Sequence, residues 1–252
     1  MSEPILTTHE LKKAFGAHTV LDGVEISVAP GEIVGLLGPN GSGKSTMLNV
    51  ISGFLKPDSG AVAFEGKAIA GLETHAIARK GLIRTFQLPS MPHRMTVRDV
   101  LRAGSREGAG LRAIFQRGAG DENVDALLEQ FKLDHVANQP ASSLSGGQKK
   151  LLSIATALRA GPRLLCLDEP TAGVHPKLRT DIVEILQSIN AQGVTMLIVE
   201  HDMAFVRRLC TRCLVLDRGA IIADCSPDTL SQNPRVVEAY LGKAVKRGGL
   251  KV

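Results

Sequence analysis

Aromatic residues are scarce in this sequence. It contains no Trp and one Tyr, and aromatic residues make up 3% of its 252 residues. Proteins that bind single-stranded nucleic acid without sequence preference stack the bases on aromatic side chains, so this shortage argues against such a partner. The net charge of +5 would also suit a polyphosphate ligand or an anionic membrane surface. We therefore expect no nucleic-acid partner.

Long apolar runs are also missing. No stretch of about 18 apolar residues occurs, and residues 1–4 do not begin a basic-then-apolar secretion signal. Cys210 and Cys213 have the C-x-x-C spacing of some redox and metal sites, but no second pair completes a four-ligand zinc site. We expect a reduced cytosolic protein that is neither secreted nor membrane-spanning.

The first third of the chain has the pattern of short β-strands. Residues 5–28 alternate between polar and apolar, and residues 61–64 and 67–69 have a hairpin pattern. We expect these strands to form an antiparallel β lobe. Residues 33–37 instead form a short apolar run, followed by a glycine-rich loop and a helical pattern at residues 46–52.

Helices and strands alternate in the rest of the chain. Helical spacing dominates from about residue 90 to 160, with an exposed connection expected at residues 104–120. Apolar strands are predicted at residues 164–167 and 196–199, with an amphipathic helix between them. Because such alternation produces sheets covered on both faces, we predict an α/β fold with a mixed or parallel core sheet.

The predicted domain organisation follows from these patterns. A single domain is expected over residues 1–242, followed by a solvated basic tail at residues 243–252. The antiparallel β lobe and the core would occupy about residues 1–89 and 161–242, and an α-helical subdomain would occupy about residues 90–160.

A glycine-rich loop follows the apolar run at residues 33–37. It matches the phosphate-loop pattern G-x-x-x-x-G-K-[ST] between a predicted strand and a predicted helix, which disfavours an accidental glycine turn. The helix N-terminus favours anions, Lys44 can reach the β- and γ-phosphates, and the Ser45 hydroxyl can bind Mg²⁺. The residues predicted to bind nucleotide here are Gly38, Pro39, Asn40, Gly41, Ser42, Gly43, Lys44, Ser45 and Thr46.

Two adjacent acids end the predicted strand at residues 164–167. Asp168 and Glu169 emerge at the carboxyl edge of the sheet, where the phosphate loop also lies. Asp168 can hold Mg²⁺, and Glu169 can polarise the attacking water as a general base. An ordinary acidic turn is the alternative, but a phosphate loop needs a magnesium partner. The sequence therefore predicts a nucleotide and Mg²⁺ as cofactors, although a phosphate loop alone does not separate transporters, GTPases, small-molecule kinases and helicases.

Between these two sites lies the pentapeptide Leu-Ser-Gly-Gly-Gln at residues 144–148. It is similar to the signature motif of ABC ATPases, a family that the chain resembles over nearly its whole length. The resemblance implies that the signature of one subunit contacts the γ-phosphate held by a second ABC ATPase subunit. A serine N-cap before a loose glycine turn is the alternative. The signature residues predicted to bind nucleotide are Ser145, Gly146, Gly147 and Gln148.

Other positions resemble landmarks of the same family. Phe15 resembles the aromatic residue that stacks on adenine, with a core Phe as the alternative. Gln87 resembles the glutamine that senses Mg²⁺ and water beside the membrane-subunit contact, and His201 resembles the histidine that contacts the γ-phosphate. His175 departs from the family, which commonly has Asp at that position, so the coupling of two ATP sites is in question. The histidines expected at the surface or in structural roles are His9, His18, His75, His93 and His135.

These landmarks give the predicted site. The catalytic set is Glu169, His201 and Gln87, and the Mg²⁺ ligands are Ser45, Gln87 and Asp168. A phosphate-loop kinase would have no use for the signature motif. A soluble ABC ATPase acting on nucleic acid or ribosomes usually carries two cassettes or a long coiled-coil insertion, and the sequence shows neither.

Three stretches, residues 84–87, 200–203 and 233–242, resemble the ATPases of branched-chain amino-acid importers. Urea or amide importers and a lipopolysaccharide exporter share parts of them. The resemblance implies ATP hydrolysis coupled to solute transport, by a peripheral subunit at the cytoplasmic face of the cell membrane. The implied partners are transmembrane permease subunits and, indirectly, a solute-binding protein.

Overall fold

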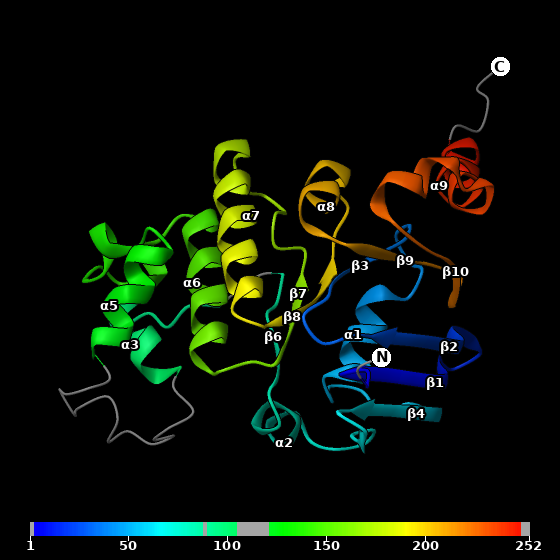
Figure 1. Ribbon diagram of the computed structural model, residues 1–252, viewed down its shortest axis with the longest axis horizontal. Helices are drawn as coiled ribbons and strands as arrows, with labels where there is room; N and C mark the ends of the chain where they lie inside the picture. The colour runs from blue at the N-terminus through cyan, green and yellow to red at the C-terminus, as the bar shows by residue number, and fades with distance from the viewer. Residues whose placement is uncertain (1–2, 88–89, 105–120, 248–252) are drawn as a thin grey trace.

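A computed structural model describes residues 3–87, 90–104 and 121–247 of the chain. All but the first residue of the connection predicted at residues 104–120 lies outside the described residues. The described residues form two sheets and the helices around them (Figure 1). None of the helices in these ranges is long and apolar enough to cross a membrane.

The smaller sheet is antiparallel, with the strand order β2-β1-β4-β5. Alternate apolar residues of its strands are buried, among them Leu21, Val24 and Phe64, so one face of this sheet packs into the core. This confirms the antiparallel lobe expected from the alternating sequence. Its strands are β1 (Leu6–Phe15), β2 (His18–Val28), β4 (Ser59–Phe64) and β5 (Lys67–Ala68).

The larger sheet has six strands in the order β10-β9-β3-β8-β7-β6. All neighbouring strands are parallel except β10, which is antiparallel to β9. The sheet is therefore mixed, and the α/β fold class is confirmed, although the sequence analysis did not identify β6, β9 or β10. The strands are β3 (Ile33–Leu37), β6 (Leu82–Arg84), β7 (Leu164–Asp168), β8 (Thr195–Val199), β9 (Arg212–Asp217) and β10 (Ala220–Cys225).

Helices cover the larger sheet, and Figure 1 shows α3, α5 and α6 gathered on the side away from the smaller sheet. The helices are α1 (Lys44–Ile51), α2 (Thr74–Arg79), α3 (Val97–Ala103), α5 (Asp121–Gln130), α6 (Gly146–Arg159), α7 (Pro176–Ala191), α8 (Met203–Leu209) and α9 (Pro234–Arg247). The short 3₁₀ helices are η1 (Asp134–Val136), η2 (Ala141–Ser143) and η3 (Pro227–Gln232).

Two hydrophobic cores lie on opposite faces of the larger sheet. In β7, Leu165 and Leu167 pack with α6 and α7, whereas Leu164 and Cys166 pack with α1 and the smaller sheet. Because successive side chains of a strand point to opposite faces, both faces of this strand are buried, as its continuous apolar run predicts. The carboxyl edge of the sheet is thereby held between two packed layers.

The C-terminal helix includes part of the predicted basic tail. Helix α9 runs to Arg247, so residues 243–247 continue this helix. Residues 248–252 lie outside the described part of the chain. The helix is linked to the glycine-rich loop by Tyr240, whose hydroxyl accepts a hydrogen bond of 3.0 Å from the Gly38 amide.

Candidate active site

The glycine-rich loop connects β3 to α1, and its backbone requires glycine. Gly38, Gly41 and Gly43 have φ angles of 145°, 77° and 111°. A Cβ atom on Gly38 would lie 2.0 Å from the Leu216 carbonyl oxygen, so a side chain cannot be accommodated there. Gly43 is the N-cap of α1 and supplies no side-chain acceptor. The loop therefore leaves the first turn of α1 suited to an anionic ligand.

Lys44 lies within this loop. Its ammonium is buried and donates hydrogen bonds to the Gly38 carbonyl at 2.7 Å and to the Pro39 carbonyl at 3.1 Å. A pocket of about 400 Å³ opens beside it. The residues that line this pocket are His18, Val20, Asn40, Gly41, Gly43, Lys44, Ser45, Thr46, Glu169 and His201. Most of the predicted phosphate-loop residues therefore share one pocket with the predicted general base.

The three predicted catalytic residues meet at the side chain of Glu169. Its Oε1 lies 2.9 Å from Nε2 of His201, and its Oε2 accepts a hydrogen bond from the Gln87 amide nitrogen. These residues follow three different strands, β7, β8 and β6. The parallel strands bring them together because they end at the same edge of the sheet. Glu169 is thus oriented from both sides, as a group that must align a water molecule requires.

The backbone of Glu169 is also unusual. Its φ angle is 47°, in the left-handed region that non-glycine residues rarely adopt. The Glu169 amide donates to the Val199 carbonyl at 2.9 Å, and the Glu169 carbonyl accepts a hydrogen bond from the ammonium of Lys150. Such strain persists only where the surroundings fix it, and it is concentrated at functional sites.

Lys150 was not identified from the sequence. It lies on α6, two residues after Gln148, and it is 7% exposed. Burial lowers the pKa of Lys150, while the charges of Glu200, Glu169 and Asp168 act in the opposite direction. Its position in the helix that follows the signature is the only sequence signal that points to it.

Asp168, at the end of β7, forms an ion pair with Arg84. The Nη2 atom of Arg84 lies 2.9 Å from Oδ2 of Asp168, and both side chains are largely buried. A carboxylate, the Ser45 hydroxyl and the Gln87 amide oxygen are hard donors of the kind that Mg²⁺ prefers. Among the described residues, no group of three or more His, Cys, Asp or Glu could hold a metal. This donor set fits Mg²⁺, which commonly takes few protein ligands and completes its shell with phosphate and water.

The signature residues lie elsewhere in the chain. Ser145 is the N-cap of α6, and its side chain and that of Gln148 form a reciprocal capping box. The N-cap reading of Ser145 is therefore correct as a description of its local structure. Within the described residues, Ser145, Gly146, Gly147 and Gln148 do not line the pocket beside Lys44. One chain alone does not bring the signature and the phosphate loop together at that pocket.

The first β-hairpin contributes to the pocket in an unexpected way. Phe15 is 50% exposed, and its ring centroid lies 5.7 Å from the Lys13 ammonium. Phe15 is not among the residues of the described chain that line the pocket. His18, paired with Phe15 across the hairpin, does line the pocket, as does Val20. His18 was expected at the surface or in a structural role; it is exposed, and it also lines this pocket.

Glu200 is a second residue without a role in the sequence analysis. It is 3% exposed, and its carboxylate accepts hydrogen bonds from the Thr171 amide at 2.8 Å and from the His201 amide at 2.8 Å. The carboxylate also accepts a hydrogen bond from the Thr171 hydroxyl. Buried charge is tolerated only when it is paired or hydrogen-bonded in this way. Glu200 therefore ties the loop after β7 to the loop after β8.

His175 and the C-x-x-C pair have structural roles in the described chain. His175 is the N-cap of α7, and its Nδ1 accepts a 3.3 Å hydrogen bond from the Lys177 amide. Cys210 and Cys213 are buried free cysteines, and burial raises the pKa of Cys213 to about 12. A thiol held in its protonated form is a poor nucleophile and a poor metal ligand.

The fold and site together define a phosphate-loop ATPase cassette with an ABC signature. A family model described as ABC transporter matches residues 21–172. The chain is 41% identical over 247 residues to the probable branched-chain amino acid transport ATP-binding protein LivG of Archaeoglobus fulgidus, covering 94% of this chain and 95% of that protein. It is 37% identical to the high-affinity branched-chain amino acid transport ATP-binding protein BraF of Pseudomonas aeruginosa, covering 97% and 100%.

Solved structures agree with these relatives. An ATP-binding cassette of an ABC transporter, in an ADP conformation, has a TM-score of 0.84 and 39% sequence identity, covering 96% of this chain and 100% of that chain. A dimeric ATP-binding cassette bound to ADP and Pi has a TM-score of 0.75 at 26% identity, covering 88% and 98%. The chain belongs to the ABC transporter family, and it is an ATP-hydrolysing subunit of that family.

Proposed function

We propose that this ATPase energises the import of branched-chain amino acids or a related small polar solute. The cargo is inferred from the relatives whose names specify branched-chain amino acid transport and which match over nearly their whole length. The ATPase assignment rests on the convergence of Glu169, His201 and Gln87 at the phosphate-loop pocket.

In this proposal, Glu169 accepts a proton from the water that attacks the γ-phosphate. His201 and Gln87 hold the Glu169 carboxylate in place, since each contacts a different carboxylate oxygen. Lys44 and the amides at the start of α1 neutralise the phosphate oxygens. Ser45, Asp168 and Gln87 would hold Mg²⁺, which would supply further stabilisation of the negative charge on the phosphates.

A second cassette completes the site in this proposal. The signature at the start of α6 does not line the pocket of its own chain, so it needs the phosphate loop of a partner subunit. A related cassette has been solved as a dimer with ADP and Pi, which supports this arrangement. The isolated chain should therefore bind ATP but hydrolyse it slowly.

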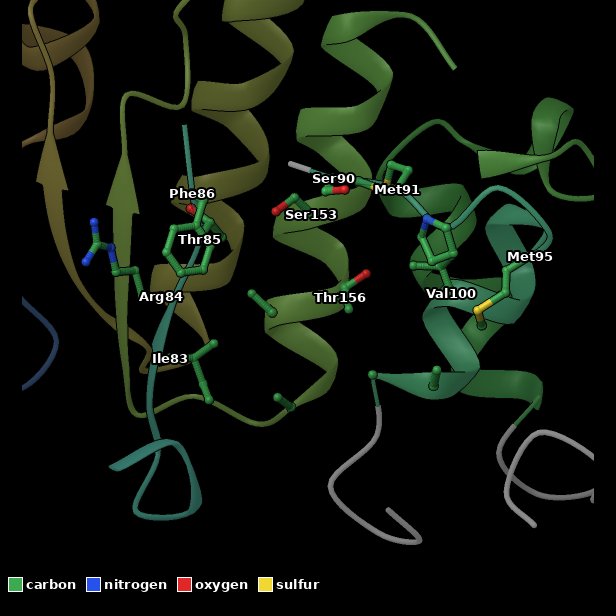
Figure 2. A pocket seen from close by; sticks show the side chains of 15 residues that line it. Ile83, Arg84, Thr85, Phe86, Ser90, Met91, Met95, Val100, Ser153 and Thr156 are labelled. Carbon is green, nitrogen blue, oxygen red and sulfur yellow. The ribbon is translucent and has the colours of Figure 1, made fainter. Parts of the chain in front are cut away.

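We further propose that a permease segment docks in a groove of about 730 Å³ beside Gln87. Figure 2 shows Ile83 and Phe86 on one side of this groove, Met95 and Val100 on the other, and Ser153 of α6 between them. Its side chains are mostly apolar, and Phe86 is 46% exposed. These features suit a short amphipathic segment of the permease, and the subunit would lie peripherally at the cytosolic face of the membrane.

Glu169→Gln tests the catalytic assignment. It should lower the hydrolysis rate by at least about 100-fold, because a general base is lost, while nucleotide affinity is retained. An ATP-bound dimer should accumulate and can be measured by size-exclusion chromatography. Glu184→Gln, at an exposed position on α7, is the matched control. Normal hydrolysis by Glu169→Gln would show that another group is the base.

Co-purification from the native membrane tests the transporter assignment. Mass spectrometry should recover two permeases and a second ATPase, and the ligand of any attached solute-binding protein identifies the cargo. Ser153→Arg, which fills the groove, should lose the permeases while ATP binding is unchanged. Ser231→Arg, at an exposed position on η3, controls for added charge. Recovery of ribosomal or DNA-repair proteins without a permease would contradict the transport proposal.

A further inference from the structure

Arg84 joins three parts of the molecule that the proposed mechanism treats separately. It ends β6, and its side chain is 5% exposed. Figure 2 shows that Arg84 points away from the groove, whereas Ile83 of the same strand points toward it. The guanidinium thus lies on the nucleotide side of β6, where Asp168 ends the neighbouring strand β7.

Three hydrogen bonds fix the orientation of this guanidinium. Its Nη2 donates to Oδ2 of Asp168 at 2.9 Å, and its Nη1 donates to Oδ1 of Asn49 at 2.6 Å and to Oγ of Ser52 at 3.2 Å. Asn49 lies on α1 and Ser52 is its C-cap residue, and α1 begins at the phosphate loop. The rigid fork of an arginine therefore sets the angle of the Asp168 carboxylate relative to that helix.

Two aromatic rings flank the same guanidinium. Its central carbon lies 5.1 Å from the centroid of Phe86 and 5.8 Å from that of Phe54, and these two rings meet edge to face. A guanidinium within about 6 Å of an aromatic centroid is attracted to the ring. Phe86 also lines the groove, so a change in its position would alter its contact with the Arg84 guanidinium.

A purely stabilising role explains this arrangement poorly. A buried ion pair loses much of its Coulomb energy to desolvation, and an apolar pair of similar volume is often equally stable. Such a pair is well suited to holding a metal-binding carboxylate in a fixed orientation, because residues that contact a metal ligand tune the metal affinity. We infer that Arg84 is a positioning residue that holds Asp168 for Mg²⁺ and connects it to Phe86 in the groove wall. This inference rests on the proposed Mg²⁺ site and the proposed docking groove.

The test uses the isolated chain and a fluorescent, non-hydrolysable ATP analogue. Binding is measured across a range of Mg²⁺ concentrations and in EDTA. Arg84→Met should raise the Mg²⁺ concentration for half-maximal binding by about 10-fold, as expected when an outer-shell partner is lost. Affinity in EDTA should stay within about twofold, since Arg84 is proposed to act through Mg²⁺ alone. Arg84→Lys keeps the charge without the fork and should give an intermediate midpoint.

Controls separate this role from a structural one. Arg98→Met removes the Arg98–Asp125 ion pair of 2.6 Å, which lies outside the site, and should leave the Mg²⁺ midpoint unchanged. Melting curves identify variants that do not fold. If Arg84→Met is unfolded, Arg84→Lys carries the test. An equal loss of affinity with and without Mg²⁺, or a lower Mg²⁺ requirement, would overturn the inference.

The link to the groove is tested by Phe86→Ala. It should raise the Mg²⁺ midpoint by about two- to fivefold, the size of one cation–π contact, and should add nothing to Arg84→Met. Additive effects would show that Phe86 does not act through Arg84. All of these measurements use the isolated chain, so failure to recover a permease would contradict the docking proposal and leave the effect of Arg84 on Mg²⁺ unchanged.

Discussion

Two glycine-containing helix N-termini in this chain are both proposed to bind phosphate, but they are capped differently. At α1, the N-cap is Gly43, whose φ is 111°, and no side-chain acceptor caps the helix in the described structure. At α6, the N-cap is Ser145, whose side chain accepts the Gln148 amide in a capping box. The first terminus is left for a ligand, whereas the second is partly satisfied by the side chains of Ser145 and Gln148.

This difference matches the surroundings of the two helices. The α1 terminus shares a pocket with Glu169 and His201, so a phosphate bound there would lie beside the proposed catalytic residues of the same chain. The α6 terminus is exposed, and a Cβ on Gly146 would meet nothing within 4 Å. The capping box stabilises α6 in the isolated chain and leaves its exposed N-terminus accessible to a second subunit. We therefore expect the α1 terminus to contact nucleotide in the isolated chain and the α6 terminus to contact it only in the dimer.

Lys44→Ala should produce the largest effect. It removes an ammonium that would contact the phosphates, and a charged hydrogen bond contributes about 1.5–3 kcal/mol, so nucleotide affinity should fall by roughly 10- to 100-fold. Isothermal titration calorimetry on the isolated chain measures this directly. Lys149→Ala, in the first turn of α6, is the matched control and should leave affinity unchanged. An equal loss of nucleotide affinity in both variants would contradict the proposal that only the α1 terminus binds nucleotide in the isolated chain.

Gly146→Ala should affect only the dimer. Because space is open at Gly146 and its backbone is helical, the added methyl group should not lower the melting temperature and should leave the nucleotide affinity of the isolated chain unchanged. It would lie between α6 and a phosphate held by the partner subunit and weaken the hydrogen bond from the Gly146 amide to that phosphate. Hydrolysis by the assembled transporter should therefore fall by about 10-fold, which corresponds to the lower end of the roughly 1.5–3 kcal/mol contributed by a hydrogen bond to a charged group.

Ser145→Ala sharpens the same point. It should also lower hydrolysis in the assembly, but it removes the helix cap as well and should destabilise the chain by about 1 kcal/mol. A pair of variants with equal hydrolysis defects and different melting temperatures would separate phosphate binding from capping. If either variant lowers the nucleotide affinity of the isolated chain, the signature contacts the nucleotide of its own chain, which would contradict the proposed contact with the partner subunit.

The comparison also explains what could be predicted from the sequence. The phosphate loop, the signature and the pair Asp168 and Glu169 are local patterns, each beside a strand or helix with clear periodicity. The predicted strand at residues 33–37 coincides with β3. Fold class and pocket followed because parallel strands end at a common edge.

The residues that were missed act through contacts between distant segments. Arg84 and Asp168 are 84 positions apart, and Gly38 and Tyr240 are 202 apart. Contacts between residues so far apart in the chain produce no local pattern that a single sequence could show. Strand β6, at three residues, is also too short to show a period. Gln87 and His201, which contact Glu169, could be predicted by resemblance to the family, whereas the contacts made by Arg84 and Tyr240 could not.

Tyr240→Phe should have a smaller effect on the α1 terminus. It removes the hydrogen bond from the Gly38 amide to the Tyr240 hydroxyl and leaves that amide without this partner. One such bond contributes about 1 kcal/mol, so nucleotide affinity in the isolated chain should fall by roughly threefold to tenfold. Val237→Ala, at an exposed position on α9, is the control. Unchanged affinity would mean that α9 does not support the phosphate loop.

The smallest expected effect concerns Lys150, which connects the two termini because it lies on α6 and donates to the Glu169 carbonyl. Burial lowers the pKa of Lys150 from its ordinary value of 10.5. Between the folded and unfolded pKa values the unfolded chain binds more protons, so the stability contributed by this group rises with pH. Lys150→Met removes the titration. The melting temperature of the wild-type chain relative to this variant should therefore be higher at about pH 9.5 than at about pH 7.5.

Melting curves at the two pH values measure this difference directly, and titrations shared by both chains cancel. Lys149→Met, at the neighbouring and less buried position, controls for the loss of a positive charge from α6. If the wild-type advantage shrinks as the pH rises, the ammonium is stabilised by its acidic neighbours more than it is penalised by burial. In that case the charge of Lys150 would help to hold Glu169 in its left-handed conformation, and the signature helix would be joined to the catalytic base by electrostatic attraction as well as by a hydrogen bond.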